Sequence, residues 1–284
     1  MITIGVTGWG DHDELYIGAP KSKHRLSLYS EHFQVVELDS SFYHIPSENQ
    51  INRWISETPQ NFQFVVKAYS AMTLHKKEIE PYKTRAEMFT IFAERMKLLQ
   101  EAGKLAMVLF QFSPRFRCTK ESVQYINYCK QSMKDFPLAI EFRNRTWYEP
   151  YRESTISYIK NEGWIHTVVD QPQAGESSCG IELFVTNREK TLIRFHGRNV
   201  VGWNHNGQSN WREVRFLYRY NKQELLEWKQ RIEMLSKQTE QLYILFNNNS
   251  GGDAATNAKE LMELLGLSTP KEITRQMSLF DHDK

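Results

Sequence analysis

The stretch LIRFHGR, residues 192–198, decides the fold and the place of the site. Side chains alternate between the two faces of a β-strand. Its apolar residues Ile193 and Phe195 share one face, which suits packing against helices. The polar residues of opposite parity are Arg194, His196 and Arg198. We therefore expect these polar side chains to point towards the axis of a closed sheet.

Seven more short runs resemble this one in being mostly apolar. All eight are Ile2–Thr7, Gln34–Asp39, Phe62–Lys67, Ala106–Phe112, Leu138–Arg143, His166–Asp170, Leu192–His196 and Leu242–Asn247. Such runs are typical of parallel strands covered on both faces. Helical patterns alternate with them, and helix-start signals occur at Ser47, Thr84, Asn221 and Asp253.

This alternation predicts an α/β protein, a single (β/α)8 TIM-type barrel over residues 1–268. The barrel would have irregular long loops after strands 6 and 7, and a flexible C-terminal tail over residues 269–284. The length of 284 residues suits one barrel of about 250 residues plus a tail. A count of eight strands favours closure over an open sheet, which is the alternative.

Composition narrows the classes of protein. The net charge is +2, from 36 Lys and Arg against 34 Asp and Glu, so a generally basic nucleic-acid-binding surface is not expected. The three cysteines form no CxxC pair, which disfavours a zinc ribbon and suits a reducing cytoplasm. No signal peptide or membrane span is evident. We predict a cytoplasmic protein with no membrane association.

Ionisable groups gather at the predicted strand ends, where barrel enzymes place their active sites. The acids are Glu37, Asp39, Glu141 and Asp170, and the bases are Lys67, Arg143, Arg194, Arg198 and His196. We expect Glu141, Asp170 or His196 to act as acid or base. The four Lys and Arg side chains would bind an anionic substrate. The alternative is a structural ion-pair network.

Further substrate contacts are expected from polar and aromatic residues near the strand ends. They are Gln111, Asn247, Asn248, Trp9, Tyr43 and Trp147. Glycines after strands 7 and 8 would let the backbone approach a phosphate, although Asp253 would oppose an anion there. No cofactor is predicted. A divalent cation such as Mg²⁺ or Mn²⁺ on the carboxylates is an alternative, with which the interleaved arginines would compete.

Several motifs carry a resemblance to a known family. They are Gly8-Trp9, Glu37-Leu38-Asp39-Ser40-Ser41-Phe42-Tyr43, Phe62–Lys67, Glu141-Phe142-Arg143 with Trp147, Phe195-His196-Gly197-Arg198, and Phe246-Asn247-Asn248 with Ala254 and Asn257-Ala258. Over residues 2–266 the chain resembles the domain-of-unknown-function 72 family of YecE-like proteins. The resemblance implies a TIM-type barrel of uncharacterised activity. Asp39 stands where the family often has Asn, and Leu74 precedes His75 where the family more often has Thr.

The tail carries a second resemblance. Gln276-Met277-Ser278-Leu279-Phe280 is similar to the short peptide with which bacterial replication and repair proteins bind the sliding clamp. Leu279 and Phe280 would be hydrophobic anchors, and Gln276 would supply hydrogen bonds. The alternative is a tail that docks on its own barrel.

Three functional hypotheses follow from these observations. The first is an enzyme, hydrolase-like in class, that acts on a small or polymeric anionic substrate. The second is a DNA repair or replication protein, nuclease-like or accessory, that the clamp recruits. The third is a non-catalytic binding barrel, since fold alone does not separate these functions.

Overall fold

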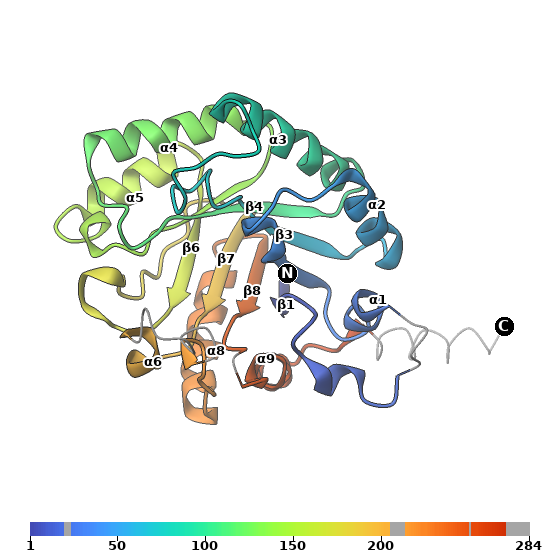
Figure 1. The fold of residues 1–284 in the computed structure, drawn as a ribbon. Coiled ribbons are helices and arrows are strands. Elements are labelled where there is room, and N and C mark those ends of the chain that lie inside the picture. Colours follow the sequence, from blue (N-terminus) through green and yellow to red (C-terminus); the bar gives the residue numbers. More distant parts are fainter. Residues whose placement is uncertain (20–23, 205–213, 250, 271–284) are drawn as a thin grey trace.

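The computed structural model describes residues 1–19, 24–204, 214–249 and 251–270. Eight parallel strands form one closed barrel in chain order, and β1 pairs with β8 to complete it. The strands are β1 Ile2–Thr7, β2 Val35–Leu38, β3 Gln63–Lys67, β4 Leu105–Gln111, β5 Leu138–Glu141, β6 Ile165–Asp170, β7 Lys190–Phe195 and β8 Gln241–Phe246. The predicted TIM-type barrel is therefore confirmed, and the open sheet is excluded (Figure 1).

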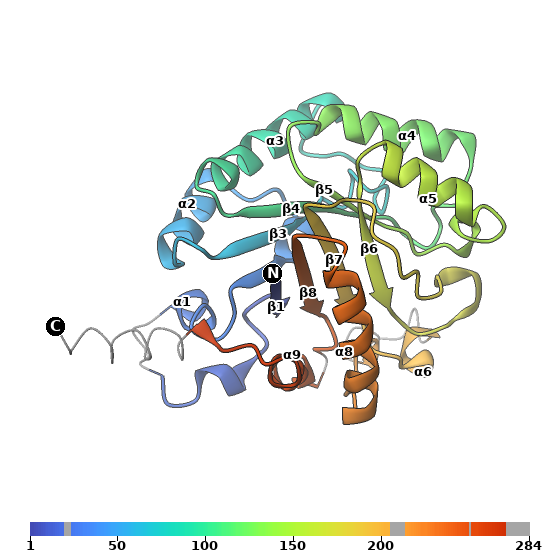
Figure 2. The same ribbon diagram turned by 180° about the vertical axis from the view of Figure 1, so that it is seen from behind.

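Helices surround the barrel (Figures 1 and 2). The α-helices are α1 Arg25–Tyr29, α2 Glu48–Glu57, α3 Arg85–Glu101, α4 Lys120–Ser132, α5 Arg152–Asn161, α6 Val200–Asn204, α8 Lys222–Ser236 and α9 Asp253–Leu264. Short 3-10 helices are η1 Asp13–Tyr16, η2 Ser40–Phe42, η3 Arg145–Trp147 and η4 Gly175–Ser177. Ser47 and Asn221 form reciprocal capping boxes at the starts of α2 and α8. Thr84, a predicted helix start, caps α3 by accepting from the Glu87 amide, but no reciprocal capping box forms there because the Glu87 carboxylate accepts from the Lys83 amide.

Two hydrophobic cores follow from the alternation of the strands. Ile193 and Phe195 belong to the large core between the sheet and the helices. Val35, Leu109 and Leu192 belong to a second core inside the barrel. Residues of the inner parity become polar towards the carboxyl ends of the strands, where active sites of barrel enzymes lie. The polar residues are Glu37, Lys67, Gln111, Glu141 and Arg194.

The connections after β6 and β7 are long, as predicted. The first contains η4. The second contains α6, and residues 205–213 within it lie outside the described part. Within the described residues, no helix has the length and apolar character needed to cross a membrane.

Candidate active site at the carboxyl ends of the strands

Arg194 of β7 lies at the centre of the barrel. Its side chain and those of its two carboxylate partners have no solvent exposure. Nε and Nη2 donate to the two oxygens of Glu37 on β2, at 2.8 and 2.5 Å. Nη1 donates to Oε2 of Glu141 on β5 at 2.5 Å. One guanidinium therefore joins three strands around the barrel axis.

The ionic states of this group are set by burial and pairing together. Burial raises the pKa of Glu37 above its ordinary value, and the charges of Arg194 and Lys67 offset only part of this rise. Burial opposes ionisation of Glu141 as well, but the charges of Arg194 and Arg143 hold its pKa well below the usual range. Glu141 is consequently an anion at neutral pH.

Glu141 in turn positions Arg143. Its Oε1 accepts hydrogen bonds from Gln111 Nε2 at 2.7 Å and from Arg143 Nε at 2.9 Å. With Arg194 on its other oxygen, Glu141 has three side-chain donors around it. Its contacts are those of a fixed counter-ion, and its predicted role as an acid or base stays a prediction.

His196 is fully buried beneath the barrel mouth. Its Nε2 lies 3.0 Å from Arg143 Nη2 and 3.2 Å from Arg194 Nη1. The guanidinium groups only donate, so they face the lone pair of Nε2. Nε2 also lies 3.4 Å from Glu141 Oε1, and Asn247 Nδ2 lies 2.9 Å from Nδ1, so both ring nitrogens have polar partners. Burial and then the two arginines keep the pKa of His196 well below its ordinary value, so the ring is neutral and its lone pair is already engaged.

Two guanidinium groups share the ring of Trp203, which belongs to α6. Arg143 lies 5.2 Å from the ring centroid and Arg215 lies 4.2 Å from it. Burial and then the charge of Arg143 lower the pKa of Arg215 to about 9. Burial also lowers the pKa of Arg143. The two guanidinium charges are thus held close together where little water surrounds them. Under this condition a bound anion stabilises both charges strongly.

The opposite side of the mouth is built from β2 and β3. Lys67 Nζ donates to Asp39 at 2.5 Å and lies 4.5 Å from the ring centroid of Phe42. Tyr43 is half exposed and meets Phe42 edge to face. Of the described residues, Lys67, Arg143, Arg194 and Arg215 face Glu37, Asp39 and Glu141 across this region. Four cationic side chains thus face three carboxylic side chains among the described residues named here.

Two residues predicted for this ring lie elsewhere. Asp170 shares the parity of Val168, which faces the helices, and it accepts from Trp228 Nε1 of α8 at 2.6 Å. Arg198 pairs with Asp170 at 2.7 Å and with Glu224 of α8 at 2.8 Å. The strand alternation ends at Gly197, whose φ of 79° is left-handed, so Arg198 turns outwards to α8. The expectation of an inward-facing Asp170 and Arg198 is corrected accordingly.

Three further candidates make packing contacts. Trp9 lies edge-on to Trp54 of α2 at 5.9 Å. Trp147 is buried and stacks on Phe142 with the ring centroids 3.9 Å apart. Asn248 is buried and donates to the Tyr218 carbonyl and to Asn257, which fixes the loop before α9. Of the predicted substrate contacts, the structure brings Lys67, Gln111, Arg143, Arg194, Asn247 and Tyr43 to the mouth or directly beneath it.

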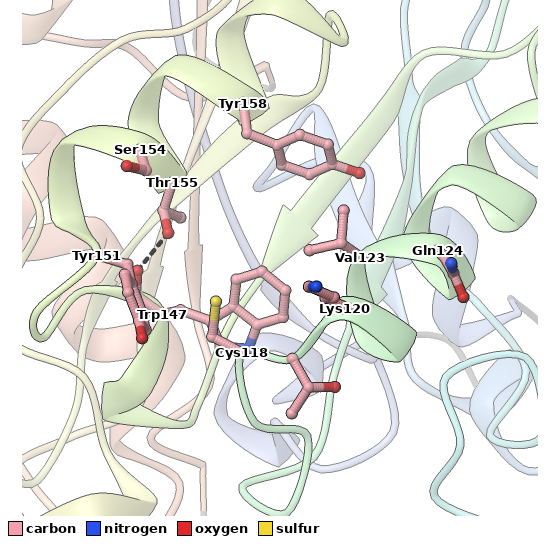
Figure 3. Close-up of a pocket in the computed structure, with 10 residues that line it drawn as sticks. Cys118, Lys120, Val123, Gln124, Trp147, Tyr151, Ser154, Thr155 and Tyr158 are labelled. Atoms are coloured by element: carbon pink, nitrogen blue, oxygen red, sulfur yellow. Dashed lines mark hydrogen bonds between the residues drawn. The ribbon is translucent and has the colours of Figure 1, made fainter.

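A cavity of about 550 Å³ lies outside this mouth, between α4 and α5 (Figure 3). Trp147 and Cys118 line it, with Val123 and Tyr158 from the two helices. In Figure 3 the Thr155 hydroxyl points away from the space towards Trp147, whose carbonyl it binds. The charged groups described above are absent from its lining. The cavity therefore does not coincide with the cluster of ionisable side chains, and we assign the candidate site to the barrel mouth.

The carboxylates in the mouth form ion pairs with Lys and Arg side chains. In the described part of the chain, no group of three or more His, Cys, Asp or Glu side chains is arranged to hold a metal ion. The alternative of a catalytic divalent cation therefore gains no support from the described geometry.

Sequence reasoning missed Arg215 and His75 as site residues. Both lie on loops, where no strand period assigns a direction to a side chain. Arg215 lies within the long connection between β7 and α8, whose aromatic residues were the available signal. His75 lies between β3 and α3 and is influenced by the charges of Arg143, Lys67 and Arg215.

The fold and site together define a TIM-type barrel protein with a cationic, aromatic-walled mouth. The chain belongs to the family described as "Protein of unknown function DUF72", whose model matches residues 3–278, and this confirms the resemblance seen in its motifs. The UPF0759 protein YunF of Bacillus subtilis is 50% identical over 282 residues, which are 99% of this chain and 100% of that protein.

Solved structures of family members have the same fold. A DUF72 protein of Enterococcus faecalis superposes with a TM-score of 0.88 at 37% identity, covering 94% of this chain and 96% of that one. A DUF72 protein of Thermotoga maritima gives a TM-score of 0.78 at 28% identity, covering 94% and 99%.

Proposed function

We propose that this protein is an enzyme whose barrel mouth binds the phosphate or carboxylate group of a substrate and performs acid/base chemistry on it. The observation that carries the proposal is the pair of guanidiniums, Arg143 and Arg215, which both contact the indole ring of Trp203. Two neighbouring guanidiniums attract an added anion more strongly than one does. An arginine pair also matches the oxygens of phosphate and carboxylate in geometry.

Arg143 is the residue best placed to bind the anion. Its Nε and Nη2 are engaged by Glu141 and His196. No described residue accepts from Nη1, which leaves that nitrogen for a ligand. Lys67 has three donors and uses one on Asp39. The anion would therefore lie between Arg143, Arg215 and Lys67, with Glu141 holding Arg143 in place.

Calorimetric titration with inorganic sulfate, inorganic phosphate and acetate at low ionic strength tests the proposal. Charge-assisted hydrogen bonds contribute about 1.5–3 kcal/mol, so Arg143→Gln should weaken anion binding by about tenfold or more. Arg152→Gln is the matched control, because Arg152 pairs with Glu182 on the surface. Absence of binding by the wild type, or equal affinities in both variants with folding intact, would contradict the proposal. Binding of phosphorylated metabolites without turnover would favour the non-catalytic barrel.

A second candidate function rests on the tail, which lies outside the described residues. The peptide Gln276-Met277-Ser278-Leu279-Phe280 favours recruitment to a bacterial sliding clamp. The test is fluorescence polarisation of a peptide covering residues 271–284, and of the full chain, against purified clamp. Micromolar binding that Leu279→Ala/Phe280→Ala abolishes would support recruitment, and salt-sensitive DNA binding would then be sought. A clamp that binds neither the peptide nor the chain would remove this candidate and leave the anion site unaffected.

A further inference from the structure

His75 is held at the mouth by an unusual backbone. Leu74, which precedes it, has φ 57°. This left-handed conformation costs an L-residue roughly 1–2 kcal/mol. The His75 amide donates to the Ser70 carbonyl at 2.9 Å, which closes the loop. Strain of this kind persists where the surroundings fix it and occurs often at functional sites.

The imidazole lies among the cations of the mouth. Its ring meets Phe42 edge to face with the centroids 4.9 Å apart, and Lys67 Nζ lies over the same Phe42 ring. His75 is exposed to solvent. Desolvation by nearby protein atoms, followed by the charges of Arg143, Lys67 and Arg215, lowers its pKa to about 4, while Glu141 opposes this shift. His75 is therefore neutral at physiological pH.

A hydrogen bond to Thr73 holds one nitrogen of the ring. His75 Nδ1 lies 2.9 Å from Thr73 Oγ1. The Thr73 hydroxyl also lies 3.4 Å from the Ser70 carbonyl, and when it donates there it can accept the Nδ1 proton. The tautomer of a histidine follows the bond that its other nitrogen makes. In the Nδ1–H tautomer the lone pair is on Nε2, and no described residue donates a hydrogen bond to it.

We infer that His75 is the proton acceptor of this site, and this rests on the proposed binding of an anionic substrate there. Nε2 takes a proton from a substrate O–H or C–H group, or from a water that attacks the substrate. The bond to hydrogen breaks, the N–H bond forms, and the electron pair stays on oxygen or carbon. Glu141 and His196 do not compete for this role, because their acceptor atoms are engaged by arginines.

The anion and the proton acceptor would be coupled. A bound anion offsets the positive charges that suppress protonation of His75, so substrate binding strengthens the base. By linkage, protonation of His75 tightens anion binding to the same extent. The charged groups involved are Lys67 with its partner Asp39, Arg143 with its partner Glu141, and Arg215.

The test is nitrogen-15 NMR of the full chain labelled in histidine, with His75→Asn to assign the signal. Sulfate is the probe, because its charge does not change between pH 4 and 8. We expect a neutral Nδ1–H tautomer at pH 5 to 7, and a pKa that sulfate raises by about one unit. Thr73→Val should mix the tautomers without abolishing sulfate binding. An Nε2–H tautomer, or an imidazole half-protonated near pH 6.5 without sulfate, would overturn the inference.

Chemical modification gives an independent readout. Diethyl pyrocarbonate acylates neutral imidazole nitrogens, and sulfate should slow its reaction at His75 several-fold while leaving the exposed His24 unchanged. If calorimetry detects no sulfate binding, the proposed function fails. If sulfate binds but neither the pKa nor the acylation of His75 responds, the inference fails alone.

Discussion

Replacement of Arg194 by Met should cost about 3–5 kcal/mol of unfolding free energy at pH 7. The substitution removes the three hydrogen bonds to carboxylates and leaves Glu37 and Glu141 inside the barrel. All three side chains have zero exposure, so water cannot replace the guanidinium. Removal of one partner from a buried ion pair typically costs this much, because a charge remains uncompensated. Glu141 keeps Arg143 and Gln111, so most of the cost falls on Glu37.

The cost should depend on pH. Without Arg194, the folded-state pKa of Glu37 rises further above its unfolded value of about 4.3. Such a group destabilises the fold above its folded pKa, and the penalty disappears as the pH falls towards the unfolded pKa. In the wild type, the lowered pKa of Glu141 gives stability that is present above about pH 4.3 and is lost below it. The difference between variant and wild type should therefore be largest at pH 7 and smaller at pH 5.

Urea unfolding monitored by fluorescence and circular dichroism at both pH values measures this difference. Arg152→Met is the control, since its exposed pairs should contribute about 0–1 kcal/mol. The double variant Glu37→Leu/Arg194→Met should recover part of the loss, because it removes both charges of the pair. A loss below about 1 kcal/mol in Arg194→Met, or a loss that is the same at pH 5 and pH 7, would refute this reasoning.

Three further stability predictions concern single positions. Lys104 Nζ lies within hydrogen-bond distance of four oxygens at the end of α2 and in the turn after it, and it can donate to three of them at once. Lys104→Met should therefore cost about 2–3 kcal/mol in urea unfolding, whereas the exposed Lys97→Met should change little. Gly197 has a φ of 79°, and a Cβ added to it would lie 2.5 Å from the Tyr218 side chain. Gly197→Ala should therefore lower Tm by several degrees, whereas Gly180→Ala, with open space around it, should not. Leu74→Gly should raise the unfolding free energy by up to about 1 kcal/mol by relieving the left-handed strain, and a loss would show that Leu74 packs more than its exposure indicates.

Strand alternation made most of the barrel interior predictable. Ile193 and Phe195 fix the helix-facing side of β7 because apolar residues are needed there, and Arg194 must then face inwards. The same local rule places Glu37 and Glu141 correctly. A period of two persists as long as the backbone stays extended. The eight predicted strands agree with the observed ones for the same reason, with differences only at their ends.

The rule fails where the backbone leaves the strand. Arg198 was assigned by counting through Gly197, whose positive φ breaks the alternation. Asp170 was placed by its position at a strand end, although its parity with Val168 directs it to the helices. Trp147 lies near a strand end, but its stacking on Phe142 depends on the path of the chain after β5. The contact of Trp147 is tertiary, so no local pattern determined it, whereas the direction of Asp170 follows from the strand alternation.

The loop residues of the site were beyond sequence reasoning for a related reason. Arg215 and His75 meet at one mouth only because the closed sheet brings the loops after β3 and β7 together. The conformation of Leu74 is rare for its residue type, so propensity argues against it.

Closure of the sheet between β1 and β8 has a consequence for folding during synthesis on the ribosome. The first strand leaves the ribosome with one edge whose partner, Leu242 onwards, is more than 230 residues away. At about 5–20 residues per second, that edge waits roughly 10–50 s for synthesis alone. Glu37 and Glu141 are likewise made well before Arg194. Until β8 docks, the nascent sheet has two open parallel edges, which are templates for pairing with other chains. Protection of those edges during translation is thus a requirement that the topology itself imposes.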